Sequence, residues 1–252
     1  MIRIGTSGYT YSWNKGKPSP FKWYIDQHFN SVEINASFYR FPTENWIKTW
    51  QVYAPKDFTF SIKVHRSITH YTRLNGARSL QLWKRFAKTL ESMKKKIDFW
   101  LFQMPSSYKY SIENIERVKA FFEKVKLRNN KLVLEFRDPS WWKEIKTIAN
   151  IGIVCSVDAP NLPNTIINTN DVIYLRLHGS KEWYNYVYSK RKLDSILSKM
   201  EKLKASKKAI YLNNDHGMLK NEVYLLEKTN SAVCEFISKP LKILKGHKTW
   251  PK

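Results

Sequence analysis

Short runs of β-branched and aromatic residues recur along the chain, separated by longer segments with the apolar spacing of amphipathic helices. Eight runs have strand character, at residues 2–6, 31–35, 59–64, 98–103, 131–136, 152–157, 172–177 and 208–212. Helical patterning is clearest at residues 44–53, 79–96, 112–127, 141–150, 186–205 and 218–228, with a shorter helix near 22–29. Residues 159–171 are typical of a loop or a broken turn. A strand followed by a crossover, repeated eight times in about 250 residues, predicts an α/β protein with a single (β/α)8 TIM-like barrel.

A doubly wound open sheet is the alternative fold that also alternates strands with helices. That fold expects a glycine-rich phosphate loop after an early strand, and the chain has neither a GxGxxG nor a GxxxxGK[ST] pattern. No stretch has the composition of a linker, and we therefore assign residues 1–230 to one barrel domain. Residues 231–252 are predicted to form a short basic C-terminal extension, packed on the barrel or trailing from it.

Alternation within the strands predicts which side chains face the barrel interior, because successive residues of a strand point to opposite sides. In six strands one face is apolar and suited to packing under helices, whereas the other becomes polar towards the carboxyl end. In the third strand Ile62 and Val64 oppose Lys63, and in the sixth strand Val157 opposes Asp158. We expect the polar face to line the barrel at the end where barrel enzymes carry their chemistry.

The composition predicts a substantial core, because 42% of the residues are apolar and 15% are aromatic. No apolar run approaches twenty residues, and the first residues lack the sections of a signal peptide, so neither a membrane span nor membrane binding is predicted. The two cysteines, Cys155 and Cys234, have no CxxC partner, which excludes a disulfide scaffold and a thiolate zinc site. These features predict a cytoplasmic protein.

The net charge of +23 separates this chain from most globular domains, with 44 Lys and Arg against 21 Asp and Glu. Such a field attracts polyanions, and the densest basic runs lie at residues 94–96, 202–208 and 239–248. A lysine-rich surface that only keeps the protein soluble is the alternative. Nucleic acid is therefore a predicted partner, bound through lysine-rich surface.

Polar and charged residues gather at the predicted carboxyl ends of the strands. We expect the catalytic groups to be Glu33, Glu135, Asp158, His178 and Asp215. The side chains expected to bind substrate are Asn35, Lys63, His65, Gln103, Arg137, Trp141, Arg176, Tyr184 and Asn213. The alternative is a structural ring of ion pairs that closes the barrel mouth, because buried charges need partners.

Several chemistries fit parts of this set. Paired carboxylates are typical of glycoside hydrolysis, but barrel glycosidases carry them after strands four and seven, where this chain has Gln103 and Arg176. A divalent metal, Mg²⁺ or Mn²⁺, is a possible cofactor, and its candidate ligands are Glu33, Glu135, Asp158 and Asp215. Three cations, Lys63, Arg137 and Arg176, would crowd a metal and suit an anionic substrate instead. His65 or His178 would then serve as an acid or base.

Seven segments in this order carry a resemblance to a known family: GTSGYTYSW at 5–13, FNSVEINASFYRFP at 29–42, PKDFTFSIKVHRSITH at 55–70, FQMP at 102–105, LEFRDPSWW at 134–142, YLRLHG at 174–179 and YLNNDHG at 211–217. Together they resemble the YecE-like family, domain of unknown function 72. The resemblance implies a TIM-like barrel and no established reaction.

The leading functional hypothesis is a hydrolase that acts on a small phosphorylated or otherwise anionic substrate. Its most concrete form is cleavage of a phosphodiester in nucleic acid. Two alternatives stay open: a non-catalytic nucleic-acid-binding protein, and a sugar-active hydrolase or isomerase.

Overall fold

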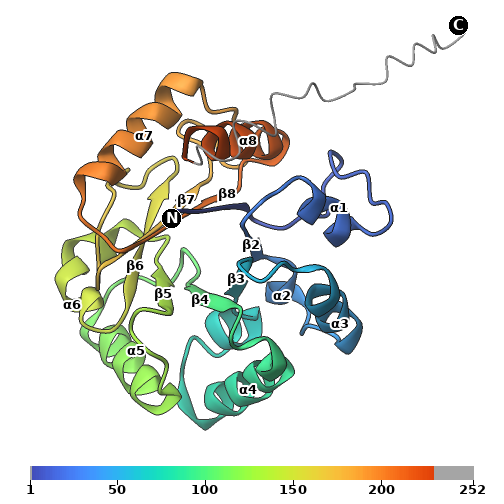
Figure 1. Ribbon diagram of the computed structural model, residues 1–252. Helices are drawn as coiled ribbons and strands as arrows, with labels where there is room; N and C mark the ends of the chain where they lie inside the picture. The colour runs from blue at the N-terminus through green and yellow to red at the C-terminus, as the bar shows by residue number, and fades with distance from the viewer. Residues whose placement is uncertain (1, 230–252) are drawn as a thin grey trace, which may run out of the picture.

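Eight parallel strands lie in the order β1-β8-β7-β6-β5-β4-β3-β2 and form a nearly closed barrel inside a ring of helices, in a computed structural model that describes residues 2–229 (Figure 1). The strands are β1 (Ile2–Thr6), β2 (Ser31–Ile34), β3 (Thr59–Lys63), β4 (Ile97–Gln103), β5 (Leu132–Glu135), β6 (Ile153–Asp158), β7 (Val172–Leu177) and β8 (Lys207–Leu212). The predicted TIM-like barrel is confirmed, and each predicted strand lies within about two residues of an observed one. The basic extension at 231–252 lies outside the described residues.

The helices are α1 (Pro20–Asp26), α2 (Ala36–Tyr39), α3 (Glu44–Tyr53), α4 (Gly76–Thr89), α5 (Ile112–Val125), α6 (Ile145–Ala149), α7 (Lys190–Lys202) and α8 (Met218–Thr229). Short helical segments accompany them within residues 2–229: the π-helical turn η1 (Ser67–Tyr71) and the 3₁₀ segments η2 (Glu91–Met93), η3 (Pro139–Glu144) and η4 (Asp215–Gly217). Within residues 2–229, none of the helices has the length and apolar character needed to cross a membrane.

The sequence predicts a helix over residues 186–205, whereas α7 begins at Lys190. The residues before Lys190 stay outside the helix because hydrogen bonds from α8 hold them. Asn221 on α8 accepts from the backbone N–H of Tyr188 and donates to its carbonyl oxygen, so these groups are satisfied without helical bonds. Ser189 then begins α7, because its side chain accepts from the backbone N–H of Lys192.

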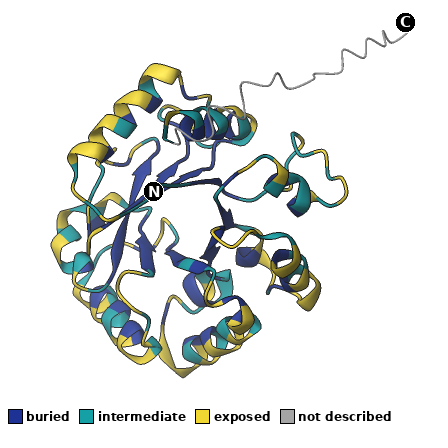
Figure 2. Ribbon diagram, in the orientation of Figure 1, coloured by how far each residue is buried: buried dark blue, intermediate teal, exposed yellow. Residues whose placement is uncertain are grey.

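The core has two layers. The outer layer lies between strands and helices, and the inner layer fills the barrel with side chains such as Phe99, Tyr174 and Tyr211. The strands are buried on both faces, whereas the helices expose their outer sides to solvent (Figure 2). This arrangement is expected where helices cover a parallel sheet from outside.

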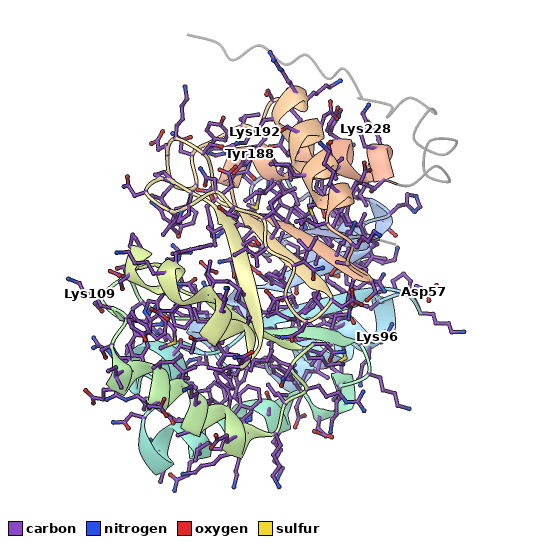
Figure 3. All side chains as sticks on the ribbon, turned by 90° about the vertical axis from the view of Figure 1, so that its left-hand side faces the viewer. Asp57, Lys96, Lys109, Tyr188, Lys192 and Lys228 are labelled. Carbon is purple, nitrogen blue, oxygen red and sulfur yellow. The ribbon has the colours of Figure 1, made fainter. Side chains whose placement is uncertain are left out.

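The interior face predicted for β6 is wrong. Cys155 and Val157 pack in the inner layer, whereas Asp158 faces outward and pairs with Lys192 on α7 at 3.2 Å, in the region where Figure 3 labels Lys192. Ser156 also faces outward and accepts from the backbone N–H of Ile167. Because all six residues of β6 are buried, polarity does not distinguish the inside of this strand from the outside.

Side chains close the seam between β1 and β2. Asn30 accepts from the backbone N–H of Ile4 and donates to the carbonyl of Ile2, while the Tyr24 hydroxyl accepts from Thr6 N–H. At Gly5 the strands are so close that a Cβ would lie 2.5 Å from the carbonyl oxygen of Ser31. The seam therefore brings the end of β1 next to Glu33 on β2.

The two ends of the barrel carry different groups. Figure 3 shows Lys109, which follows β4, on the side opposite to Asp57 and Lys96, which precede β3 and β4. The carboxyl ends of all eight strands meet on the side of Lys109, because the strands are parallel. The candidate site is built there.

Candidate functional site

Arg176 on β7 lies at the centre of the site, completely buried between two carboxylates from other strands. Its Nη2 donates to Glu33 Oε1 at 2.7 Å, and its Nη1 donates to Glu135 Oε2 at 2.6 Å. Burial disfavours the charge of Arg176, but the two carboxylates outweigh burial and raise its pKa well above the usual value. Burial likewise opposes ionisation of Glu135, but Arg176 and Arg137 hold its pKa well below the ordinary range. The three groups form a charged cluster.

Further donors bond to both carboxylates of this cluster. Glu33 accepts from the hydroxyls of Ser7 at 2.7 Å and Tyr174 at 2.6 Å. Glu135 Oε1 accepts from Nε of Arg137 at 2.9 Å. Both carboxylates are therefore held in place by several donors, a task different from that of a free acid or base.

His178 completes the enclosure of Glu135. Its Nδ1 lies 3.0 Å from Asn213 Nδ2, and its Nε2 lies 3.3 Å from Arg176 Nη1 and 3.6 Å from Glu135 Oε1. Burial and the neighbouring Arg176 lower the pKa of His178 to about 3. The imidazole is therefore neutral at physiological pH and acts as a hydrogen-bonding partner in the cluster.

Lys63 at the end of β3 is the charged group of the site that lacks a counter-ion. Its side chain is 7% exposed, and among the described residues no carboxylate oxygen lies within 4.0 Å of its Nζ. The Nζ lies 4.3 Å from the centre of the Phe38 ring. Burial and the positive field of Arg176 lower its pKa to about 7. The amine is consequently present in both protonation states near neutral pH.

Arg137 borders a cleft of about 400 Å³ that opens after β5, β6 and β7. Its guanidinium donates to the Tyr184 hydroxyl at 2.8 Å and to Gln103 Oε1 at 3.3 Å, and stacks 4.6 Å from the centre of the Trp183 ring. Three of the five N–H donors of Arg137 are used by these bonds and by Glu135, which leaves two for a ligand.

A second cleft of about 430 Å³ opens after β1 and β2. It is lined by aromatic side chains that include Tyr11 and Trp46, and Arg40 stacks 4.9 Å from the centre of the Trp46 ring. Asn35 also lines this cleft, and its buried Oδ1 has no hydrogen-bond partner among the described residues. Each cleft therefore combines an arginine with a tryptophan.

Several residues predicted for the site lie outside the charged cluster, among them Asn35 in the second cleft. Asp158 pairs with Lys192 behind β6. Trp141 is 1% exposed and stacks on Phe136, with ring centres 3.9 Å apart, so it belongs to the core. His65 bonds to the Ser67 hydroxyl and to the carbonyl of Tyr39, and Asp215 is half-buried in the turn η4.

The predicted metal ligands do not come together. Across residues 2–229, no three His, Cys, Asp or Glu side chains form a group that could hold a metal ion. Arg176 occupies the space between Glu33 and Glu135, and its positive charge opposes a divalent cation there. The donor set therefore does not fit Mg²⁺ or Mn²⁺.

Two residues that bond to Glu33, namely Tyr174 and Ser7, were not identified from the sequence. Tyr174 precedes Arg176 by two residues in β7, so strand alternation alone would have placed it on the same interior face. Ser7 follows β1 and reaches Glu33 across the seam, through an isolated bridge that no local pattern indicates.

Comparisons with known proteins agree with this architecture. A family model described as protein of unknown function DUF72 matches residues 3–233. The fold is similar to a crystal structure of a DUF72 family protein from Thermotoga maritima, with a TM-score of 0.77 and 25% sequence identity over 90% of this chain and 98% of that chain. A DUF72 family protein from Enterococcus faecalis is similar in fold, with a TM-score of 0.78 and 18% identity over 90% of this chain and 94% of that one. Among curated proteins the sequence finds no match.

Proposed function

The chain belongs to the DUF72 family of proteins of unknown function, and we propose that it is an enzyme that acts on a small anionic substrate at the barrel mouth. The substrate carries a phosphate or carboxylate group, and Lys63 is the residue that reacts with it. The observation that carries this proposal is the unpaired Lys63: three cations face two carboxylates, and an anionic ligand would supply the missing negative charge.

Lys63 is the best candidate for proton transfer, because other side chains already hold the two carboxylates, Glu33 and Glu135, by hydrogen bonds. Arg176, Ser7 and Tyr174 hold Glu33, while Arg176 and Arg137 hold Glu135. A group is most effective as a general acid or base when its pKa lies near the working pH, and the pKa of Lys63 is about 7. These contacts argue against hydrolysis by free carboxylates. The proposal is therefore limited to an anionic substrate, with an amine as the reacting group.

A thermal unfolding series tests the anion site. We expect inorganic phosphate to raise the Tm of the wild type more than chloride does at matched ionic strength, because a ligand that binds only the folded state stabilises it. The Lys63→Met variant should lose the phosphate-specific shift. Lys48→Met, which removes an exposed lysine from α3, should retain it. Equal shifts in all three proteins would overturn the proposal.

Nucleic acid is a second candidate ligand, favoured by the stacking of Arg137 on Trp183 beside an open cleft. Bases stack on aromatic side chains, and Trp183→Ala should weaken binding of a labelled single strand by about 1–3 kcal/mol. Affinity should also fall roughly a thousandfold between 50 and 200 mM salt if about six phosphates are contacted. Absence of saturable binding at 50 mM salt would remove nucleic acid as a ligand.

A further inference from the structure

We propose that Lys63 forms a Schiff base with the carbonyl group of its anionic substrate, so that the protein takes aldehydes or ketones carrying a phosphate or carboxylate. The inference rests on the proposed function, because it uses the same site and the same residue. It goes further by naming the bond that forms and the functional group that the substrate must contain.

The surroundings of Lys63 are those of a nucleophilic amine. An amine attacks a carbonyl only when it is neutral and its lone pair is free, and enzymes secure this by desolvation or by a neighbouring cation. Lys63 has both features: it is buried against the Phe38 ring, and Arg176 lies close enough to disfavour its charge. Within residues 2–229, its Nζ makes no hydrogen bond that would occupy the lone pair or hold the ammonium form.

Other partly buried lysines of the barrel are engaged differently. Lys131 at the opposite end of the barrel donates to the carbonyl oxygen of Ile97 at 2.6 Å, and burial lowers its pKa as well. Lys96 donates to carbonyl oxygens in the turn before β3. Their amines donate to backbone oxygens, so a lowered pKa by itself does not distinguish Lys63. What distinguishes Lys63, among the described residues, is that its amine has neither a hydrogen-bond acceptor nor an ion-pair partner at the carboxyl end of β3.

The step is balanced without a further reactant. The Lys63 nitrogen forms a bond to the carbonyl carbon, the C–O π electrons move to oxygen, and a nitrogen proton moves to that oxygen to give a carbinolamine. The hydroxyl then leaves as water with one more proton from solvent, and the nitrogen lone pair forms the C=N bond. The products are a protonated imine, which draws electrons from the neighbouring carbon, and one water molecule.

Arg137 is placed to hold the anionic group of such a substrate. Two of its N–H donors are free of the bonds to Glu135, Tyr184 and Gln103, and it borders the open cleft. An arginine binds phosphate or carboxylate through a pair of parallel N–H donors. Lys63 lies at the carboxyl end of β3 on the same side of the barrel but does not line this cleft, so the proposal requires the carbonyl end of the substrate to pass beyond Arg137 into the barrel mouth.

Pyridoxal 5′-phosphate is a suitable probe because it carries an aldehyde and a phosphate. The protein is incubated at pH 7 with low concentrations of the probe, reduced with borohydride to fix any imine, and mapped by peptide mass spectrometry. We expect Lys63 to be labelled faster than each exposed lysine by roughly tenfold or more, because about half of its amine is neutral at this pH, whereas an ordinary lysine is almost entirely protonated. Inorganic phosphate should slow labelling of Lys63 alone, and pyridoxal without phosphate should label it less.

Matched variants distinguish specific labelling of Lys63 from the general reactivity of lysine amines. Lys131→Met should leave labelling of Lys63 unchanged, and Arg137→Gln should reduce it by weakening capture of the phosphate. Labelling spread evenly over exposed lysines, or stronger at Lys131 than at Lys63, would overturn the Schiff base. If Lys63 stays unlabelled while phosphate still raises Tm in a Lys63-dependent manner, the Schiff base fails and the proposed function stands. If neither effect occurs, both fail.

Discussion

Arg176 donates from Nη1 to Oε2 of Glu135 across 2.6 Å, and neither side chain is exposed to solvent. The same guanidinium reaches Glu33 through Nη2, so one arginine joins strands β2, β5 and β7 at the barrel mouth. Buried ions of this kind are stable only while each has its partners. The contact therefore fixes the geometry of the mouth, and among the described residues it leaves Lys63 beside it without a counter-ion.

Replacing Arg176 with methionine should destabilise the protein strongly, because it leaves Glu33 and Glu135 buried without their shared cation. Breaking a buried ion pair from one side costs about 3–5 kcal/mol. Urea unfolding at pH 7 measures the loss. Lys119→Met on α5, which removes an exposed pair with Glu116, is the control and should cost far less. Similar midpoints for both variants would contradict the central role of Arg176.

Lys63→Met should be more stable than the wild type at pH 6, and the difference should shrink towards pH 10. The pKa of Lys63 is lowered from 10.5 to about 7, so between these values the unfolded chain binds more protons than the folded one. Wild-type stability therefore rises with pH across this window, and the penalty is fully present below pH 7. Its size is on the order of a few kcal/mol.

The measurement is Tm against pH for wild type, Lys63→Met and the exposed control Lys48→Met. His70 lies near Lys63, and burial lowers its pKa from 6.5 to about 4, so its effect on the pH dependence of stability ends near pH 7. A constant difference between wild type and Lys63→Met from pH 6 to 10 would show that the amine is not perturbed.

Glu222→Gln should raise Tm at pH 8 and change it little at pH 4.5. Burial raises the pKa of Glu222 well above its usual value, and its Oε1 lies 2.7 Å from the Tyr24 hydroxyl. The folded protein thus retains a proton that the unfolded chain releases, and wild-type stability falls as pH rises above the unfolded pKa. Glutamine keeps a partner for Tyr24 without this penalty. Glu201→Gln, at an exposed position, should leave Tm unchanged at both pH values.

Gly179→Ala should distort the loop that carries Trp183 and Tyr184 to Arg137. Gly179 has φ of +116°, and a Cβ there would lie 2.2 Å from the carbonyl oxygen of Glu182. Side-chain-bearing residues pay about 1–3 kcal/mol or more in such a conformation, and the close contact adds to it. Urea unfolding measures the loss of stability, and tryptophan fluorescence reports the distortion of the loop around Trp183. Gly16→Ala, with φ of +70° in open space, should cost less and leave the fluorescence unchanged.

Much of the barrel could be predicted from the sequence because strand alternation and helix spacing are local properties. The inward positions of Glu33, Glu135 and Arg176 follow from a period of two along short strands, once the apolar face is assigned to the helices. The prediction was wrong at Asp158 because β6 is buried on both sides, and polarity then carries no information about direction. Trp141 was assigned to the site for a related reason. An aromatic residue that follows a strand can pack in the core or contact a ligand, and Trp141 packs in the core against Phe136.

The sequence by itself determined the fold class and was enough to place most of the charged site residues at one end of the barrel. Only the tertiary structure decided how they pair: Arg176 takes both carboxylates, Asp158 goes to Lys192, and Lys63 is left with an aromatic ring. Pairing depends on distances between side chains from strands far apart in the chain, within an ångström or two. Residue type and spacing along the sequence do not encode those distances, which arise when the barrel closes.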